Sequence, residues 1–292
     1  MILNDLFRLK DIDPQHVLVL RHRPREPQLH KVLPWLAAEE PDLFNAYQQS
    51  QSEKVEQAMK RAQYVASFIG HEAGKALFVG LYSVKGSIPI TREQFWEIPA
   101  NIKLKSLGMN GFTEESPRSS CLWFDLMLRD FYPHWKGKLV IRWPGLELAW
   151  CRWAYKPKNE MPVLAILEES ALDPPMPEWE EIELSWEQLG VIPTSMKSKL
   201  KEWRGIYYIF DTSDKKGYVG SAYGEFNIYG RWKGYAESGD GGNRLLKLRD
   251  PHNFLFYILE RVSPDMDKAN VIKLEWSWMK RLHTRNPSGL NV

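Results

Sequence analysis

Hydrophobic residues change their spacing several times along the chain, and each change predicts a different kind of element. Residues up to about 61 show helical spacing, with a predicted core of Leu33, Trp35, Leu36, Leu43, Phe44 and Tyr47. From residue 64 the spacing becomes that of strands, because apolar, β-branched and aromatic runs at 64–69 and 76–84 flank a polar turn. The pattern predicts a helical start followed by a β-hairpin.

A second pair of apolar runs lies at 138–143 and 147–154, with a Pro-Gly turn at 144–145 between them. This arrangement predicts another hairpin. The first half of the chain is therefore expected to be α+β, with a small β-sheet or barrel. A short basic patch precedes its helical part and consists of Arg21, His22, Arg23 and Arg25.

The middle of the chain has the composition of a connector. Residues 168–187 contain eight acidic residues and no basic one, and 173–177 is a proline-rich cluster that disfavours helix and strand. We therefore expect an N-terminal domain at 1–171, an acidic linker with a lead-in helix at 172–202, and a C-terminal domain at 203–292.

Composition narrows the class of protein. The 292 residues carry a net charge of only +2, although residues 201–292 hold 15 basic against 11 acidic side chains. No apolar run is long enough to span a bilayer, so no membrane association is expected. Two cysteines are too few for a disulfide framework or a thiolate zinc cage, which favours a reducing compartment and makes the cytoplasm the expected location.

The last ninety residues show a clear succession of elements. Two short strands at 205–210 and 218–221 enclose a polar turn, and helical spacing follows at 226–238. A third strand is predicted at 254–262, and Ser263-Pro264-Asp265 then begins a helix that reaches about residue 283. The sequence predicts a small three-stranded antiparallel sheet flanked by helices.

Glu275 lies off the polar side of the predicted last helix. That polar side consists of Asn270, Lys273, Ser277, Lys280 and Arg281, whereas the neighbours of Glu275 on the helix are Ile272, Trp276, Met279 and Leu282. A carboxylate in apolar surroundings needs a cation or strong donors. A metal ion meets this need, and so does an ion pair with Arg231 or Lys233; the helix alone does not decide between them.

Several residues stand in an ordered set along this region. Gly205-Ile206-Tyr207 is followed after ten residues by Tyr218-Val219-Gly220, then by Arg231, Tyr235, Glu275 and Asn291. Together they resemble the GIY-YIG nucleases, over about 203–292. Val219 replaces the isoleucine of the family's second tripeptide and keeps its size and branching. Asn286 lies close to Asn291 and is an alternative for the asparagine.

The resemblance implies a metal-dependent DNA endonuclease that hydrolyses phosphodiester bonds. Glu275 would hold one Mg²⁺, or Mn²⁺ in its place, through oxygen. Arg231 would bind a phosphate oxygen and stabilise charge in the transition state. Tyr218 would be the general base, with Tyr207 and Tyr235 orienting water and phosphate, and Asn291 would brace the site by hydrogen bonds. An ordinary tyrosine is only about one part in a thousand ionised at pH 7, so a nearby cation must assist.

The first half of the chain is the natural place for target selection. Some of its tryptophans, interleaved with Arg142 and Arg152, could stack on bases or hold a flipped one, whereas at least half of them are expected to fill the core. Segments 77–84 and 135–153 resemble the small barrels of the PUA-like superfamily, some of which read modified bases. The aromatic set consists of Trp96, Trp123, Trp135, Trp143, Trp150 and Trp153.

Three functions remain open from the sequence. The first is an endonuclease of restriction, anti-phage defence or mobile elements, with modified DNA as one target class. The second is a structure-specific repair nuclease, and the third is a non-catalytic nucleic-acid binder, against which the presence of both Arg231 and Glu275 argues. Because one site cuts one strand at a time, a homodimer is one expected way to cut both.

Overall fold

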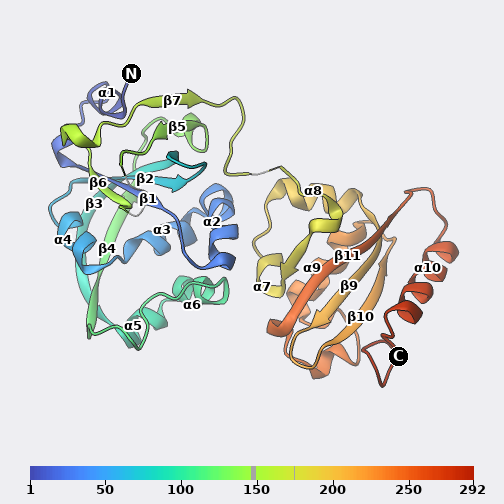
Figure 1. Ribbon diagram of the computed structural model, residues 1–292. Coiled ribbons are helices and arrows are strands. Elements are labelled where there is room, and N and C mark those ends of the chain that lie inside the picture. The colour runs from blue at the N-terminus through green and yellow to red at the C-terminus, as the bar shows by residue number, and fades with distance from the viewer. Residues whose placement is uncertain (146–148, 174) are drawn as a thin grey trace. The chain divides into compact units, whose positions relative to one another are not determined.

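The chain forms two compact units in the computed structural model, which describes residues 1–145, 149–173 and 175–292. Unit 1 comprises residues 1–174, and unit 2 comprises residues 175–292. Both units mix helices with a sheet, so the predicted α+β class is confirmed (Figure 1). Parts of two predicted features, residues 147–148 of the second hairpin and Pro174 of the proline cluster, lie outside the described residues.

Unit 1 combines a seven-stranded sheet with helices and short 3-10 turns (Figure 1). Its helices are α1 (Leu3–Arg8), α2 (Pro27–Glu39), α3 (Pro41–Gln49), α4 (Glu53–Met59), α5 (Arg92–Glu97) and α6 (Pro99–Ser106). Its strands are β1 (Val17–His22), β2 (Tyr64–Gly70), β3 (Lys75–Thr91), β4 (Ser120–Leu128), β5 (Leu139–Arg142), β6 (Cys151–Trp153) and β7 (Val163–Ile166). The 3-10 turns are η1 (Pro14–His16), η2 (Pro133–Trp135) and η3 (Pro157–Asn159).

The sheet of unit 1 is curled like half of a barrel and follows the order β6-β1-β2-β3-β5-β7, while β4 pairs with the far end of β3. The predicted hairpin of β2 and β3 is confirmed. The second predicted hairpin is wrong, because β5 pairs with β3 and β7 whereas β6 pairs antiparallel with β1. Apolar runs on both sides of a turn identify strands, but they do not fix the partner of each strand.

Strand β1 is the main element that the helical prediction missed. Alternate residues face two separate cores, with Val17 and Val19 on one side and Leu18 and Leu20 on the other. The strand therefore reads as a short continuous apolar run without a period of two. Its burial extends to Arg21 and His22, which are only 1% and 7% exposed and therefore do not form part of a basic surface. Of the four residues of the predicted basic patch, Arg23 and Arg25 are exposed.

Unit 2 consists of three layers, in which a four-stranded antiparallel sheet of order β10-β9-β11-β8 lies between helices (Figure 1). The strands are β8 (Glu183–Ser185), β9 (Arg204–Asp211), β10 (Lys216–Ala222) and β11 (Phe254–Val262). The helices are α7 (Trp186–Leu189), α8 (Thr194–Glu202), α9 (Asn227–Ser238) and α10 (Lys268–Arg281). The 3-10 turns are η4 (Trp179–Glu181), η5 (Leu246–Leu248) and η6 (Pro251–Asn253).

The sheet of unit 2 has one strand more than the predicted three. Strand β8, from the segment expected to be a linker, pairs antiparallel with β11, and the lead-in helix α8 packs against α9. Three residues are too few to give a strand pattern, which is why β8 is visible only in the folded chain. None of the described helices is long and apolar enough to cross a membrane.

Candidate active site

The two tripeptides lie side by side on β9 and β10. Because side chains alternate along a strand, Ile206 and Val219 pack under α10, while Tyr207 and Tyr218 face the opposite side, toward α9. The two tyrosine rings have centroids 6.4 Å apart. The hairpin thus presents both tripeptide tyrosines on one face of the sheet.

The glycines of both tripeptides permit close approach. A Cβ on Gly205 would collide with the backbone oxygen of Glu260, at the point where β11 bulges against β9. A Cβ on Gly220 would collide with the ring of Tyr207. Both positions therefore require the absence of a side chain, the second because it lies directly beneath a candidate catalytic ring.

Helix α9 brings Arg231 and Tyr235 onto this face of the sheet. The Tyr207 and Tyr235 hydroxyls lie 3.1 Å apart, and the Nε of Arg231 donates to the Tyr207 hydroxyl at 3.2 Å. Tyr207 and Tyr235 are fully buried, whereas Arg231 is exposed. Tyr207, which is itself bonded to Tyr235, therefore holds the Nε of an arginine side chain that is exposed to solvent.

Burial sets the protonation of these tyrosines. It raises the pKa of Tyr207, with a further increase from Tyr218 and a partial reduction from Arg231. Burial likewise raises the pKa of Tyr235. Both side chains are therefore neutral hydroxyls at pH 7, which suits positioning but not proton abstraction.

Glu275 reaches the site from α10, on the other side of the edge strand β10. Its Oε2 accepts a hydrogen bond of 2.6 Å from the Ser221 hydroxyl. Burial raises the pKa of Glu275, while the Ser221 hydrogen bond and the charge of Arg231 lower it. The candidate residues thus lie on both sides of β10, with Arg231 close enough to act on Glu275 electrostatically.

The apolar neighbours that the helix pattern gave Glu275 are partly wrong. Trp276 is 60% exposed and Leu282 is also exposed, whereas Val271, Leu274 and Trp278 pack against the sheet. The contact face of α10 is rotated relative to the predicted one, because it is set by the sheet surface that the helix meets. Glu275 lies at the border of this face and is half-buried.

Asn291 ties the end of the chain to β10. Its Oδ1 accepts from the Val219 amide at 2.9 Å, and its Nδ2 donates to the Val219 carbonyl at 2.8 Å. Asn291 is buried, whereas the alternative Asn286 is exposed. These two bonds fix the backbone directly beside Tyr218.

Comparison with known proteins agrees with this geometry. Residues 204–289 match the family model of the GIY-YIG catalytic domain. The chain therefore carries a GIY-YIG catalytic domain. No curated protein matches the chain.

Two solved structures are similar to the GIY-YIG region of this chain. The catalytic domain of the homing endonuclease I-TevI shares 30% identity over 30% of this chain and 97% of its own, with a TM-score of 0.26. A mutant of the same intron endonuclease domain shares 29% identity over 30% of this chain and 92% of its own, also with a TM-score of 0.26.

The residues of the GIY-YIG domain fit a divalent ion bound mainly by non-protein oxygen. Residues 1–145, 149–173 and 175–292 contain no group of three or more His, Cys, Asp or Glu side chains arranged to hold a metal. Lys233, one of the alternative partners of Glu275, instead pairs with Glu237 at 3.5 Å. A carboxylate held by a single hydroxyl fits a site completed by water and phosphate.

Ser221 is a residue of the site that the sequence prediction missed. The alternation along β10 carries the signal, since Ser221 follows Val219 by two positions and must face α10. Its hydroxyl sets the position of the Glu275 carboxylate.

Proposed function

We propose that this protein is a metal-dependent DNA endonuclease of restriction or anti-phage defence, in which unit 2 cuts and unit 1 selects the target. The observation that carries the proposal is the Arg231–Tyr207–Tyr235 cluster, with Glu275 beyond the adjoining edge strand. The similarity to the catalytic domain of a homing endonuclease supports DNA as the substrate. A cytoplasmic location and a homodimer that cuts both strands belong to the same proposal.

Arg231 binds the scissile phosphate in this proposal. Its Nε is occupied by Tyr207, which directs the outer edge of the guanidinium toward solvent, where a phosphate oxygen can accept from the fork. Tyr207 and Tyr235 are neutral, and Arg231 makes no ion pair with a carboxylate among the described residues, so its charge is available for the transition state.

Tyr218 takes the proton from the attacking water. It lies beside Tyr207 on the same face and at a backbone position fixed by Asn291. Glu275 would hold the divalent ion, which supplies positive charge that stabilises the phosphate oxygens and favours ionisation of nearby groups. Ser221 keeps the carboxylate in the orientation needed for this task.

The proposal is tested by incubating the full chain with plasmid and phage DNA in Mg²⁺ or in EDTA. The DNAs are unmodified, methylated, hydroxymethylated or glucosylated, and flap and bubble substrates are included. We expect cleavage of at least one DNA that requires Mg²⁺ and is lost in Glu275→Ala but retained in Glu237→Ala, which removes an exposed carboxylate on α9. If none of these substrates were cut, the proposal would be contradicted. Preference for flaps and bubbles would assign the chain to repair instead.

A further inference from the structure

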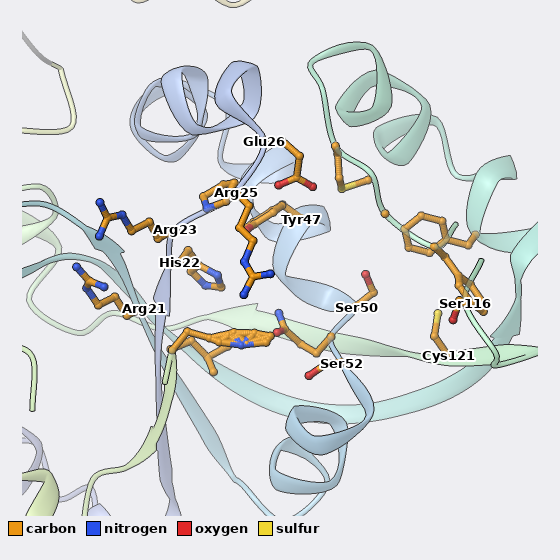
Figure 2. Close-up of a pocket in the computed structure, with 18 of the residues that line it drawn as sticks. Arg21, His22, Arg23, Arg25, Glu26, Tyr47, Ser50, Ser52, Ser116 and Cys121 are labelled. Atoms are coloured by element: carbon orange, nitrogen blue, oxygen red, sulfur yellow. The ribbon is translucent and has the colours of Figure 1, made fainter. Parts of the chain in front are cut away.

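Unit 1 contains a cavity of about 930 Å³ that no motif of the sequence predicts. It is lined by the end of β1 and the loop after it, by α3 and the following residues 50–52, by α5, and by residues 109–121 (Figure 2). This volume lies within the range of small-molecule and cofactor sites. Segments far apart in the sequence therefore build one ligand-sized space.

Arg25 supplies a positive charge inside the cavity. Figure 2 shows its side chain pointing into the open space, whereas Arg21 and Arg23 extend away from it. Within the part of the chain that the structure describes, Arg25 is exposed and makes no hydrogen bond or ion pair. Arg118, another lining residue, is by contrast held by Glu56 at 2.8 Å. An arginine such as Arg25, which points into a concave site and has no carboxylate partner among the described residues, suits an anionic group of a ligand, above all a phosphate.

The walls of the cavity offer aromatic surface and a buried polar group. Four aromatic side chains line it, namely Tyr47, Phe95, Phe112 and Trp150, of which Trp150 is half-buried. His22 is 7% exposed, its Nε2 has no hydrogen-bond partner among the described residues, and burial lowers its pKa to about 4. The imidazole is therefore neutral at pH 7 and can make one hydrogen bond to a ligand. A planar heterocycle can both pack against these aromatic rings and form a hydrogen bond with the Nε2 of His22.

A second cavity, of about 430 Å³, adjoins the first, because Ser52 and Trp150 line both. Its described lining contains no acidic residue and carries five basic ones, namely Lys54, Arg61, Arg152, Lys156 and Lys158. Such a groove attracts a phosphate backbone. The first cavity, with its aromatic walls and Arg25, therefore lies next to a second cavity lined by basic side chains.

The geometry points to the first cavity as a site for a single nucleotide unit, whose base packs against Trp150 and whose phosphate binds Arg25, with the second groove holding the adjoining backbone. The inference rests on the proposed role of unit 1 in target selection. The same chemistry has two sources, a nucleotide flipped out of duplex DNA and a free nucleotide. Flipping requires the base to leave the stack, and packing against Trp150 together with a phosphate contact at Arg25 offsets that cost.

The test measures binding by the full chain carrying Glu275→Ala, so that DNA stays intact. The probes are duplexes with a test base of cytosine, 5-methylcytosine, 5-hydroxymethylcytosine, its glucosylated form or N6-methyladenine, each beside 2-aminopurine, and the mononucleotides dCMP and dAMP. Arg25→Ala is compared with Arg129→Ala, which removes an exposed arginine that lines neither cavity. Trp150→Ala is the second variant, and thermal unfolding checks that each variant folds.

We expect 2-aminopurine fluorescence to rise on binding of at least one duplex, and Arg25→Ala and Trp150→Ala to weaken that binding about tenfold, as loss of a stacking or phosphate contact does. A tenfold loss for the mononucleotides alone would assign the site to a free nucleotide. Equal binding of every probe by Arg25→Ala, Trp150→Ala and Arg129→Ala would overturn the inference. If the wild-type chain cuts DNA but Arg25→Ala binds every probe as well as Arg129→Ala does, the nuclease function stands and the nucleotide site is wrong. If Arg25→Ala weakens binding but the wild-type chain cuts no DNA, the nucleotide site stands and the nuclease function is wrong.

Discussion

The two units differ in how their functional groups are spread along the chain. In unit 2 the candidate groups come from one hairpin and two helices, and the hydrogen bonds among them connect neighbouring elements. In unit 1 the cavity draws on segments from residue 20 to residue 150. The sequence had offered Arg25 in a basic patch and Trp150 in an aromatic set, but no spacing joined the two into one site. Chemistry tied to a local framework can be identified from spacing, whereas a recognition surface made of distant loops cannot.

The largest expected effect separates catalysis from binding. Arg231→Ala should lower the single-turnover cleavage rate by about a thousandfold, the loss seen when a donor to transition-state charge is removed. Arg231→Lys should recover little of this, because lysine lacks the fork that binds both Tyr207 and a phosphate. Lys233→Ala, on the same helix, is the control. A rate for Arg231→Ala within tenfold of wild type would remove the arginine from the mechanism.

The next effect distinguishes the two faces of the β9–β10 hairpin. Tyr218→Phe should reduce cleavage by about a hundredfold or more, as expected for loss of a general base. Tyr208→Phe should leave the rate within about threefold, because the Tyr208 hydroxyl lies over Gly217, four positions along β10 from Ser221, and on the opposite face of the sheet from Arg231. Comparable losses in both variants, measured at saturating Mg²⁺, would show that packing and not proton transfer is responsible.

A third effect concerns the stability of unit 2. Asn291→Ala leaves the buried amide and carbonyl of Val219 without partners, so the free energy of unfolding should fall by about 2–3 kcal/mol. Asn286→Ala removes an exposed side chain and should cost less than about 0.5 kcal/mol. Denaturant unfolding of both variants measures the difference. If the larger loss belonged to Asn286, the bracing role of Asn291 would be wrong.

The smallest effect lies in unit 1 and depends on pH. Burial against Phe44 and Tyr47 lowers the pKa of His22 from its ordinary value of 6.5 to about 4, so the unfolded chain binds a proton between these values that the folded chain does not. Stability should therefore fall by about 1 kcal/mol between pH 7 and pH 5.5. His22→Gln should remove this slope, and exposed His16→Gln should keep it. Denaturant unfolding at both pH values measures this difference. If the free energy of unfolding of His22→Gln fell with pH as much as that of wild type, the loss would not come from His22.

The sequence predicted unit 2 well because each element there has its own pattern. Strands β9, β10 and β11 and helix α9 occur where the spacing placed them, and α10 is present but begins at Lys268, capped by Asp267, and not at the predicted Ser263-Pro264-Asp265. The rotation of α10 and the strand β8 escaped prediction, since the first depends on the sheet surface that the helix meets and the second is only three residues long. Ser221 was overlooked because a single serine carries no signal until its strand face is known.

Unit 1 was harder to predict, for a related physical reason. Strand β1 is buried on both sides, so its apolar residues show no alternation, and Arg21 and His22 appeared to belong to a surface patch. The pairing of β6 with β1 joins residues more than 100 positions apart. The position of Arg25 in a cavity follows only from that long-range topology.

The most direct test of this division of labour measures DNA binding and single-turnover cleavage on the same preparations of wild type, Glu275→Ala and Arg25→Ala. We predict that Glu275→Ala keeps the affinity of wild type and loses cleavage, whereas Arg25→Ala binds its target about tenfold more weakly, as loss of a phosphate contact predicts, yet cuts at the wild-type rate once DNA is saturated with protein. Cleavage by Glu275→Ala, or a collapse of the saturated rate in Arg25→Ala, would contradict the assignment of cutting to unit 2 and of target selection to unit 1.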